Sequence, residues 1–168
     1  MKGKYFVLAA IILGIVAGVT YAAFFAAPQV VAYGDNVTVY YTGALPNGTV
    51  FGSNFNGQPL QFTVGANQVI QGFQNGVMGM KLNETKTITV PMAEAYGPVN
   101  PSLIVNIPMN AFGNQTILPG MTIVESGNGV QSSGVVKSEN KTFAIVDFNP
   151  PLAGYNLTFT IRVVQIQK

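Results

Sequence analysis

The chain has 168 residues, only 8% of them charged, and a net charge of +2, so no basic nucleic-acid-binding surface is expected. It contains no cysteine and no histidine, which excludes disulfides, thiolate catalysis, Ser-His-Asp triads and the usual zinc sites. Its six carboxylates are scattered and no phosphate-binding glycine loop occurs, so an enzyme of this sequence needs no nucleophile, metal or cofactor.

The N-terminal segment has the pattern of a membrane anchor. Lys2 and Lys4 precede Tyr5–Ala27, a run of roughly 23 positions without a charged residue, which is long enough to cross a bilayer and longer than a signal-peptide core. The basic residues before the run predict the N-terminus inside and the C-terminus outside. Residues 1–27 are therefore predicted to be a retained signal anchor, with secretion after cleavage as the alternative, and residues 28–34 a linker.

Strand patterns follow the linker. From Asn36, apolar and polar residues alternate, which predicts a half-buried strand over residues 36–41. Pro46-Asn47-Gly48 is typical of a hairpin turn, because Asn-Gly accepts positive φ angles. Further strands are predicted at 50–51, 60–64 and 85–90, and a long final strand at 157–166.

One short helix is predicted among these strands. Val69, Ile70, Phe73 and Val77 recur at spacings of three and four, which places them on one helical face, and glycines bound the segment. The predicted fold class is α+β, mostly β. A single helix in such a domain is usually wrapped by a sheet. The apolar face is therefore either ordinary core or the floor of a binding pocket.

The region from about Val99 to Val146 has a different character. It holds three prolines and several glycines, with strand-like runs at 121–124, 134–136 and 143–146. Structureless loops of this length are uncommon. The sequence therefore predicts a small inserted β-rich subdomain.

The sequence also contains an excess of glycosylation sequons. An excess of Asn-x-Thr motifs favours an exported, glycosylated protein, although an Asn- and Thr-rich surface without sugar is the alternative. The six candidate acceptors are Asn36, Asn47, Asn83, Asn114, Asn140 and Asn156.

A series of motifs makes the order of these elements specific. The block Val-Ile-x-Gly-aromatic-x-x-Gly-Val at 69–77 and the Ala-Tyr-Gly turn at 95–97 are its most specific members; the others are Val-Tyr-Tyr-Thr-Gly at 39–43, Asn-Gly-Thr-Val-Phe at 47–51, Pro-Leu-Gln-Phe-Thr-Val-Gly at 59–65 and Leu-Thr-Phe at 157–159. The series resembles the FKBP-type peptidyl-prolyl cis-trans isomerases. Gly120-Met121 and the return at 147–159 are similar to the SlyD-like branch, in which an insert-in-flap domain binds unfolded chains.

The resemblance implies a domain organisation. It predicts an FKBP-like antiparallel sheet wrapped around one short helix, formed by residues 35–98 and 147–168. Residues 99–146 would be the inserted, insert-in-flap-like chaperone domain. With the N-terminal transmembrane helix, the chain is expected to be a membrane-anchored, archaeal-type version with its C-terminal domain outside the cytoplasm.

The resemblance also implies a prolyl-binding pocket. Phe73 would form the floor, where many family members carry Trp, while the Ile70 N–H and the Tyr96 hydroxyl would each hold a substrate carbonyl. Phe62 and Val77 are assigned to the core. Gly52 departs from the family pattern, which commonly has Asp there, and Leu60 replaces a common aromatic. The implied catalytic residues are Tyr41, Phe51, Ile70, Phe73, Tyr96 and Phe159, and the implied substrate-binding residues are Leu60 and Val69.

The implied activity agrees with the chemistry that the composition leaves open. Rotation about an X-Pro amide breaks no bond, and a dry aromatic pocket favours the twisted amide, so no cofactor is needed. We expect a monomeric isomerase that acts on unfolded or Pro-containing polypeptides, accelerates the folding of exported proteins and binds no nucleic acid. The alternatives are a non-catalytic membrane-anchored chaperone or interaction module that kept the fold, and a structural β-rich surface protein.

Overall fold

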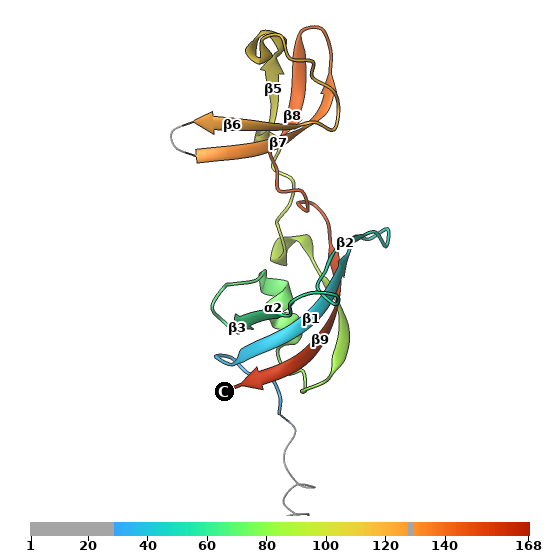
Figure 1. Ribbon diagram of the computed structural model, residues 1–168, viewed down its shortest axis with the longest axis vertical. Coiled ribbons are helices and arrows are strands. Elements are labelled where there is room, and N and C mark those ends of the chain that lie inside the picture. Colours follow the sequence, from blue (N-terminus) through green and yellow to red (C-terminus); the bar gives the residue numbers. More distant parts are fainter. Residues whose placement is uncertain (1–28, 128–129) are drawn as a thin grey trace, which may run out of the picture.

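The computed structural model of the protein describes residues 29–127 and 130–168. Two antiparallel sheets lie at opposite ends of an elongated molecule (Figure 1). Within the described residues there is one α-helix, α2 (Gln71–Val77), and the other regular elements are strands and short 3-10 helices. The prediction of a mostly β fold with antiparallel sheets and one short helix is thereby confirmed.

The first sheet has five strands in the order β2-β1-β9-β4, with β3 also paired to β1. The long strands β1 (Asn36–Ala44) and β9 (Leu157–Gln167) form its centre, and β4 (Thr85–Val90) pairs with β9. On the other side of β1, β3 (Leu60–Thr63) and β2 (Val50–Ser53) pair one after the other along the same strand. The alternation predicted for β1 is present, because Val37 and Val39 are fully buried.

Asn54 fills the gap between β2 and β3. Its Oδ1 accepts a hydrogen bond from the Tyr41 N–H at 2.6 Å, and its Nδ2 donates to the Val39 carbonyl at 3.2 Å and the Gln58 carbonyl at 3.3 Å. The side chain thus replaces backbone partners that β1 lacks where one strand ends and the next has not begun.

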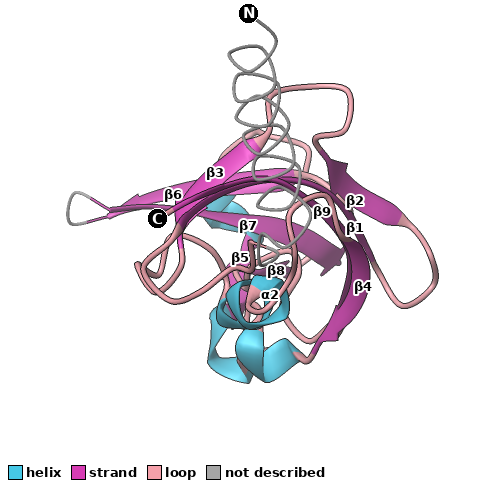
Figure 2. Ribbon diagram, turned by 90° about the horizontal axis from the view of Figure 1, so that it is seen from below, coloured by secondary structure: helices cyan, strands magenta, loops and turns pink. Residues whose placement is uncertain are grey.

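The helix α2 lies in the concave side of the first sheet (Figure 2). Its close approach to β4 depends on Gly72 and Gly76, because a Cβ atom at either position would collide with the side chain of Val90 or Ile88. Ile70 is the N-cap with φ −58° and ψ 145°, so the helix begins at Gln71, two residues later than the apolar spacing from Val69 suggests.

The segment predicted as a linker packs onto the first sheet instead. Val31 is 3% exposed, its N–H donates to the Met80 carbonyl at 2.9 Å, and its carbonyl accepts from the Gly79 N–H at 2.9 Å. Val30 forms an isolated bridge with Lys81. Residues 29–34 therefore belong to the fold of the first sheet, because the Val31 side chain is part of its buried core.

The second sheet has four strands in the order β5-β8-β7-β6. They are β5 (Ile104–Pro108), β6 (Thr122–Gly127), β7 (Val130–Glu139) and β8 (Phe143–Asp147). Of the 3-10 helices, η1 (Met92–Glu94) follows β4 of the first sheet, η2 (Pro101–Leu103) precedes β5 and η3 (Met109–Phe112) follows β5. The second sheet has its own buried cluster of Ile117, Val136, Ala144 and Val146. The strand pattern did not predict β5, and β7 is longer than the predicted run at 134–136.

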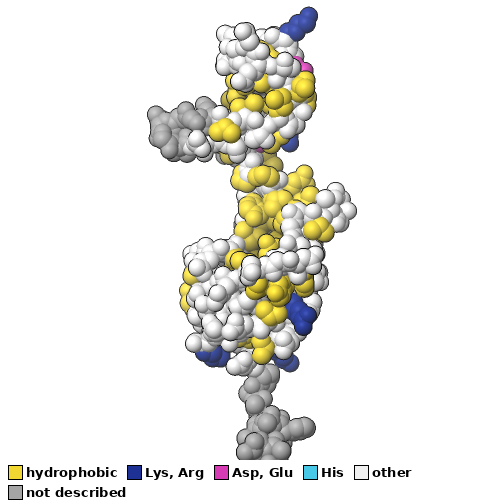
Figure 3. Space-filling model, viewed as in Figure 1, with side chains coloured by type: hydrophobic (Ala, Val, Ile, Leu, Met, Phe, Trp, Pro, Cys, Tyr) yellow, Lys and Arg dark blue, Asp and Glu magenta, His cyan; other side chains and the backbone are white. Residues whose placement is uncertain are grey.

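Two chain segments join the sheets, residues 97–103 and 147–156, and we call them the neck. Asn100 and Asn149 tie them together: the Asn100 N–H donates to the Asn149 Oδ1 at 2.8 Å, and the Asn149 Nδ2 donates to the Asn100 carbonyl at 3.1 Å. The Gly154 N–H also donates to the Gly97 carbonyl at 2.8 Å. Hydrophobic side chains gather around the neck on the face shown in Figure 3.

Asp147 stands where the neck leaves the second sheet. The backbone N–H of Asn149 donates to its Oδ1 at 2.9 Å and the Asn149 amide at 2.8 Å, and the Lys137 ammonium lies 3.7 Å from its Oδ2. These hydrogen bonds, the backbone one above all, hold the pKa of Asp147 below its usual value.

The predicted anchor, residues 1–27, lies outside the described residues. Among the residues that are described, no helix has the length and hydrophobicity needed to cross a membrane.

Candidate functional site

A cavity of about 480 Å³ lies at the end of the first sheet where β9 begins after the neck. Its walls come from six parts of the chain: β1, β2, β3 with the loop that follows it, α2, the turn after η1, and β9. All eight site residues predicted from the sequence line it. The full lining is Tyr41, Phe51, Leu60, Asn67, Gln68, Val69, Ile70, Phe73, Tyr96 and Phe159.

Edge-to-face aromatic contacts build the inner wall. The Phe159 ring lies 5.1 Å from that of Phe73, 5.8 Å from that of Phe51 and 6.1 Å from that of Tyr41, measured between centroids, at interplanar angles of 85°, 88° and 63°. Tyr41 also meets Phe73 at 5.6 Å and 80°. Such geometries are the preferred ones for aromatic pairs and fix each ring relative to the next.

Gly43 on β1 allows two of these rings to approach. A Cβ atom there would lie 2.5 Å from Cζ of Phe51 and 3.0 Å from Cε1 of Phe159. A larger residue would therefore push the rings toward the cavity, so the position of the aromatic wall depends on this glycine.

The loop between β3 and α2 forms the polar side. Gln68 Oε1 accepts from the Thr63 N–H and Gln74 Oε1 accepts from the Gly65 N–H, both at 2.8 Å. These bonds hold the loop against the sheet. In the described part of the chain, the Ile70 N–H makes no hydrogen bond, so it remains available to a ligand.

Tyr96 stands at the rim, in the turn after η1. Its side chain is 46% exposed, in contrast to Phe73 at 3% and Phe159 at 5%. The turn is closed by the Gly97 N–H, which donates to the Met92 carbonyl at 2.8 Å, and Gly97 has a φ of 80° that favours glycine. The hydroxyl of Tyr96 is therefore a polar group at the edge of an apolar cavity.

Two lining residues were not predicted. Asn67 and Gln68 lie in the loop after β3, and Asn67 has a φ of 54°. An Asn flanked by a glycine-containing turn is a weak signal for a left-handed position, and polar loop residues have no periodicity from which a cavity could be inferred. Phe62 and Val77, which the sequence assigns to the core, are buried and do not line the cavity.

None of the described residues that line the cavity carries a charged side chain. Gly52 lies beside it on β2, paired with Gly43, and a Cβ atom there would meet nothing within 4 Å. The space for a carboxylate is thus present although the carboxylate is not. Among the described residues there is also no group of three side chains suited to hold a metal ion.

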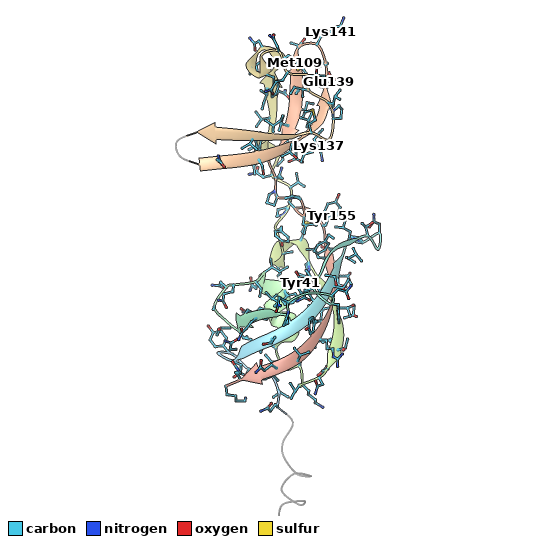
Figure 4. All side chains as sticks on the ribbon, viewed as in Figure 1. Tyr41, Met109, Lys137, Glu139, Lys141 and Tyr155 are labelled. Atoms are coloured by element: carbon cyan, nitrogen blue, oxygen red, sulfur yellow. The ribbon has the colours of Figure 1, made fainter. Side chains whose placement is uncertain are left out.

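A second cavity, of about 410 Å³, lies on the second sheet. Five of its seven lining residues are apolar, and one of them, Val124, is 60% exposed. In the stick view, Tyr41 lies below the neck, while Met109 of η3 lies far above it in the second sheet's part of the molecule (Figure 4). The lining is Ile107, Ala111, Phe112, Gln115, Thr122, Ile123 and Val124.

The sequon asparagines differ in exposure. Asn36 is half-buried in β1, and its Oδ1 is buried without a hydrogen-bond partner. The remaining five asparagines are exposed: Asn47, Asn83, Asn114, Asn140 and Asn156.

A family model and several known proteins that resemble this chain are all described as peptidyl-prolyl cis-trans isomerases. Residues 27–143 match the model of a family described as FKBP-type peptidyl-prolyl cis-trans isomerase. The chain is 29% identical over 142 residues to a probable FKBP-type 16 kDa peptidyl-prolyl cis-trans isomerase of Pseudomonas fluorescens, covering 84% of this chain and 95% of that protein.

Two further relatives come from other organisms. A short-type peptidyl-prolyl cis-trans isomerase of Methanocaldococcus jannaschii is 38% identical over 112 residues, which is 66% of this chain and 69% of that protein. The FKBP-type isomerase SlyD of Helicobacter pylori is 31% identical over 118 residues, 68% of this chain and 63% of that protein.

Proposed function

Since the chain belongs to the FKBP-type peptidyl-prolyl cis-trans isomerase family, and is therefore an isomerase of X-Pro bonds, we propose that its cavity below the neck is the prolyl site and that its substrates are exported proteins. The observation that supports the site most strongly is that all eight predicted residues, from separate segments, line one uncharged cavity.

The proposed mechanism needs only these residues. Amide resonance holds an X-Pro bond planar with a barrier of about 18–20 kcal/mol. The prolyl ring would rest on Phe73 between Tyr41 and Phe159 and would displace water from the cavity. The Ile70 N–H would hold one substrate carbonyl and the Tyr96 hydroxyl another, so that the substrate is fixed on both sides of the bond that rotates. The twisted amide, which has lost its resonance and part of its polarity, is favoured in such surroundings.

We further propose that residues 99–146 are an insert-in-flap-like chaperone domain. The cavity on the second sheet, with five apolar residues among the seven that line it, and the 60% exposed Val124 support this assignment. Exposed apolar surface of this kind suits capture of unfolded segments. The chaperone domain would retain a chain while the prolyl site, beyond the neck, isomerises its prolines, a step that otherwise takes tens of seconds.

The location is part of the proposal. The uncharged run at 5–27 and the six sequons support a membrane-anchored, single-pass, archaeal-type protein with residues 29–168 outside the cytoplasm. The protein would act there as a monomer. Secretion after cleavage of the anchor is the alternative.

Two assays of the full chain separate the catalytic and chaperone parts. Acceleration of isomerisation in a short X-Pro peptide is expected, and its absence would contradict the prolyl site. Val124→Asp is expected to weaken suppression of aggregation of an unfolded protein while leaving peptide turnover unchanged. Leu118→Asp is the matched control, because Leu118 is 54% exposed but lies outside the second cavity. Equal effects of the two variants would contradict the chaperone assignment.

A further inference from the structure

One end of the first sheet carries exposed apolar side chains that neither cavity uses. We call it the basal face; it consists of residues 29–35, 78–84 and 165–168. The Leu82 N–H donates to the Gln29 carbonyl at 3.1 Å, which joins its first two segments. Its exposed apolar residues are Val30 at 39%, Tyr33 at 75%, Met78 at 43% and Leu82 at 38%.

The basal face is opposite the prolyl cavity. β1 runs from Asn36, paired with Gln167, to Ala44, paired with Thr158. Tyr41 and Phe159 of the cavity belong to the far half of this ladder. Figure 1 shows the same order along the molecule, with the C-terminus at one end and the second sheet at the other.

The spacing of the sequence places the basal face close to any membrane that holds the anchor. Val30 pairs with Lys81 and follows Ala27, the last residue of the predicted anchor, by three positions. Three residues span at most about 10–11 Å, and the polar layer on each side of a bilayer is about 5–8 Å thick. If residues 5–27 cross the bilayer, the three residues from Ala27 to Val30 are too few to hold the fold away from the lipid. The basal face therefore lies at the headgroup layer.

The side chains of the basal face suit that layer. Tyrosine is enriched at membrane interfaces, and Tyr33 is the most exposed of the large apolar residues. Lys81 is exposed and the Lys168 side chain is 62% exposed, so both can approach anionic headgroups.

The acidic side chains of the basal face are Asp35 and Glu84. Asp35 is 6% exposed, accepts from the Ala32 N–H at 2.9 Å and lies 3.7 Å from the Lys168 ammonium. Glu84 accepts from the Lys81 backbone N–H at 2.7 Å. Both side-chain carboxylates are thus engaged within the protein, while the Lys81 ammonium forms no ion pair with any described residue and can face anionic lipid.

We propose that the basal face docks on the surface of the bilayer that holds residues 5–27, with Val30, Tyr33, Met78 and Leu82 in the headgroup layer. The inference rests on the membrane anchor proposed above and goes beyond it, because it fixes the orientation of the two sheets relative to the bilayer. The prolyl cavity and the second sheet are held away from the lipid, open to polypeptides that arrive through the aqueous phase.

The test uses the full chain in phosphatidylcholine vesicles that contain phosphatidylglycerol. Because the chain has no tryptophan, Tyr33→Trp introduces a single emitter. Its emission should shift to shorter wavelength and be quenched by lipids brominated near the headgroup. Tyr155→Trp on the neck, where the native residue is 47% exposed, is the matched control and should show neither effect.

Three results would overturn the docking. A Tyr33→Trp protein that sediments with the vesicles and isomerises a Pro peptide, but is quenched no more than the Tyr155→Trp protein, contradicts it and leaves the isomerase function in place. A chain that does not sediment with vesicles contradicts the anchor and the docking together. A glycan found on Asn83 would also contradict docking, since it would stand between the basal face and the lipid.

Two further variants test the docking independently. The first replaces the tryptophan with another probe, and the second tests the role of headgroup charge. A fluorophore on Met78→Cys, unique because the chain has no cysteine, should be quenched in the same way, and an unquenched label would count against docking. Lys81→Gln should lower the ratio of docked to undocked protein about fivefold on anionic vesicles. An unchanged ratio would contradict the role of headgroup charge.

Discussion

The ring of Phe73 meets the ring of Phe159 edge to face, with centroids 5.1 Å apart and an interplanar angle of 85°. This contact joins α2 to β9 and at the same time forms the inner wall of the cavity proposed as the prolyl site. Both side chains are almost fully buried. Under the proposed function, stability and activity depend on the same rings, and a test of the site has to separate the two.

A substitution of Tyr96 separates an effect on activity from an effect on stability most clearly, because Tyr96 is 46% exposed. Tyr96→Phe removes only the hydroxyl proposed to hold a substrate carbonyl. We expect kcat/KM for an X-Pro peptide to fall about two- to tenfold, the effect of one hydrogen bond of 0.5–1.5 kcal/mol, with the unfolding midpoint unchanged. Tyr155→Phe, at 47% exposed, should leave both quantities unchanged. A Tyr96→Phe enzyme with full activity would exclude the hydroxyl from the mechanism.

A substitution at Gly52 tests whether the carboxylate that the family commonly has at this position affects activity. Because a Cβ atom there meets nothing within 4 Å, Gly52→Asp should be accommodated without loss of stability, and a carboxylate beside the cavity should raise kcat/KM for the peptide. Gly57→Asp places the same charge elsewhere on the same connection and should have no effect. A lower rate in Gly52→Asp, with unchanged thermal unfolding, would show that this site works better without the charge.

Asn54 tests how the rim of the cavity is supported. Asn54→Ala removes its three hydrogen bonds and leaves the Tyr41 N–H without a partner. We expect the free energy of unfolding in urea to fall by about 1–3 kcal/mol. Asn56→Ala, at an exposed neighbouring position, should change it by less than about 0.5 kcal/mol. Equal stability of the two variants would mean that water replaces the Asn54 side chain without cost.

The lowered pKa of Asp147 predicts that the stability of the fold depends on pH. Its pKa is lowered in the folded state, chiefly by the hydrogen bond from the Asn149 N–H, so its carboxylate stabilises the fold above the unfolded-state pKa of about 3.9. That contribution should be lost as the pH falls from about 4 through the lower folded pKa. Urea unfolding of the full chain from pH 7 to pH 2.5 measures it, and Asp147→Asn should flatten the acid side of the curve. Identical curves for the two proteins would contradict the role of this carboxylate.

The sequence predicted the first sheet and the cavity better than the second sheet. The alternation in β1 and β9 and the spacing of Phe73 to Val77 are direct consequences of burial, so they are visible without a structure. The resemblance then linked residues as distant as Tyr41 and Phe159, whose proximity no local pattern could reveal.

The features that were missed share a physical cause. β5 consists of mostly exposed residues and ends at Pro108, and its partner β8 lies some 40 positions later in the chain, so no local alternation marks it. Asn67 and Gln68 are held by turn geometry and by the hydrogen bonds of the loop after β3. The place of Val31 in the core follows from tertiary pairing with Met80, which overrides the loop-like composition around it.

The most direct test of the prolyl site compares Phe73→Leu with Phe62→Leu in the full chain. The two rings touch, with centroids 5.9 Å apart, and both are at most 3% exposed, but only Phe73 lines the cavity. Each variant should lose about 0.5–3 kcal/mol of stability. Only Phe73→Leu should lower kcat/KM for an X-Pro peptide, by about two- to tenfold for the lost aromatic contact. Equal turnover by the two folded variants would contradict the proposal that this cavity binds the prolyl ring.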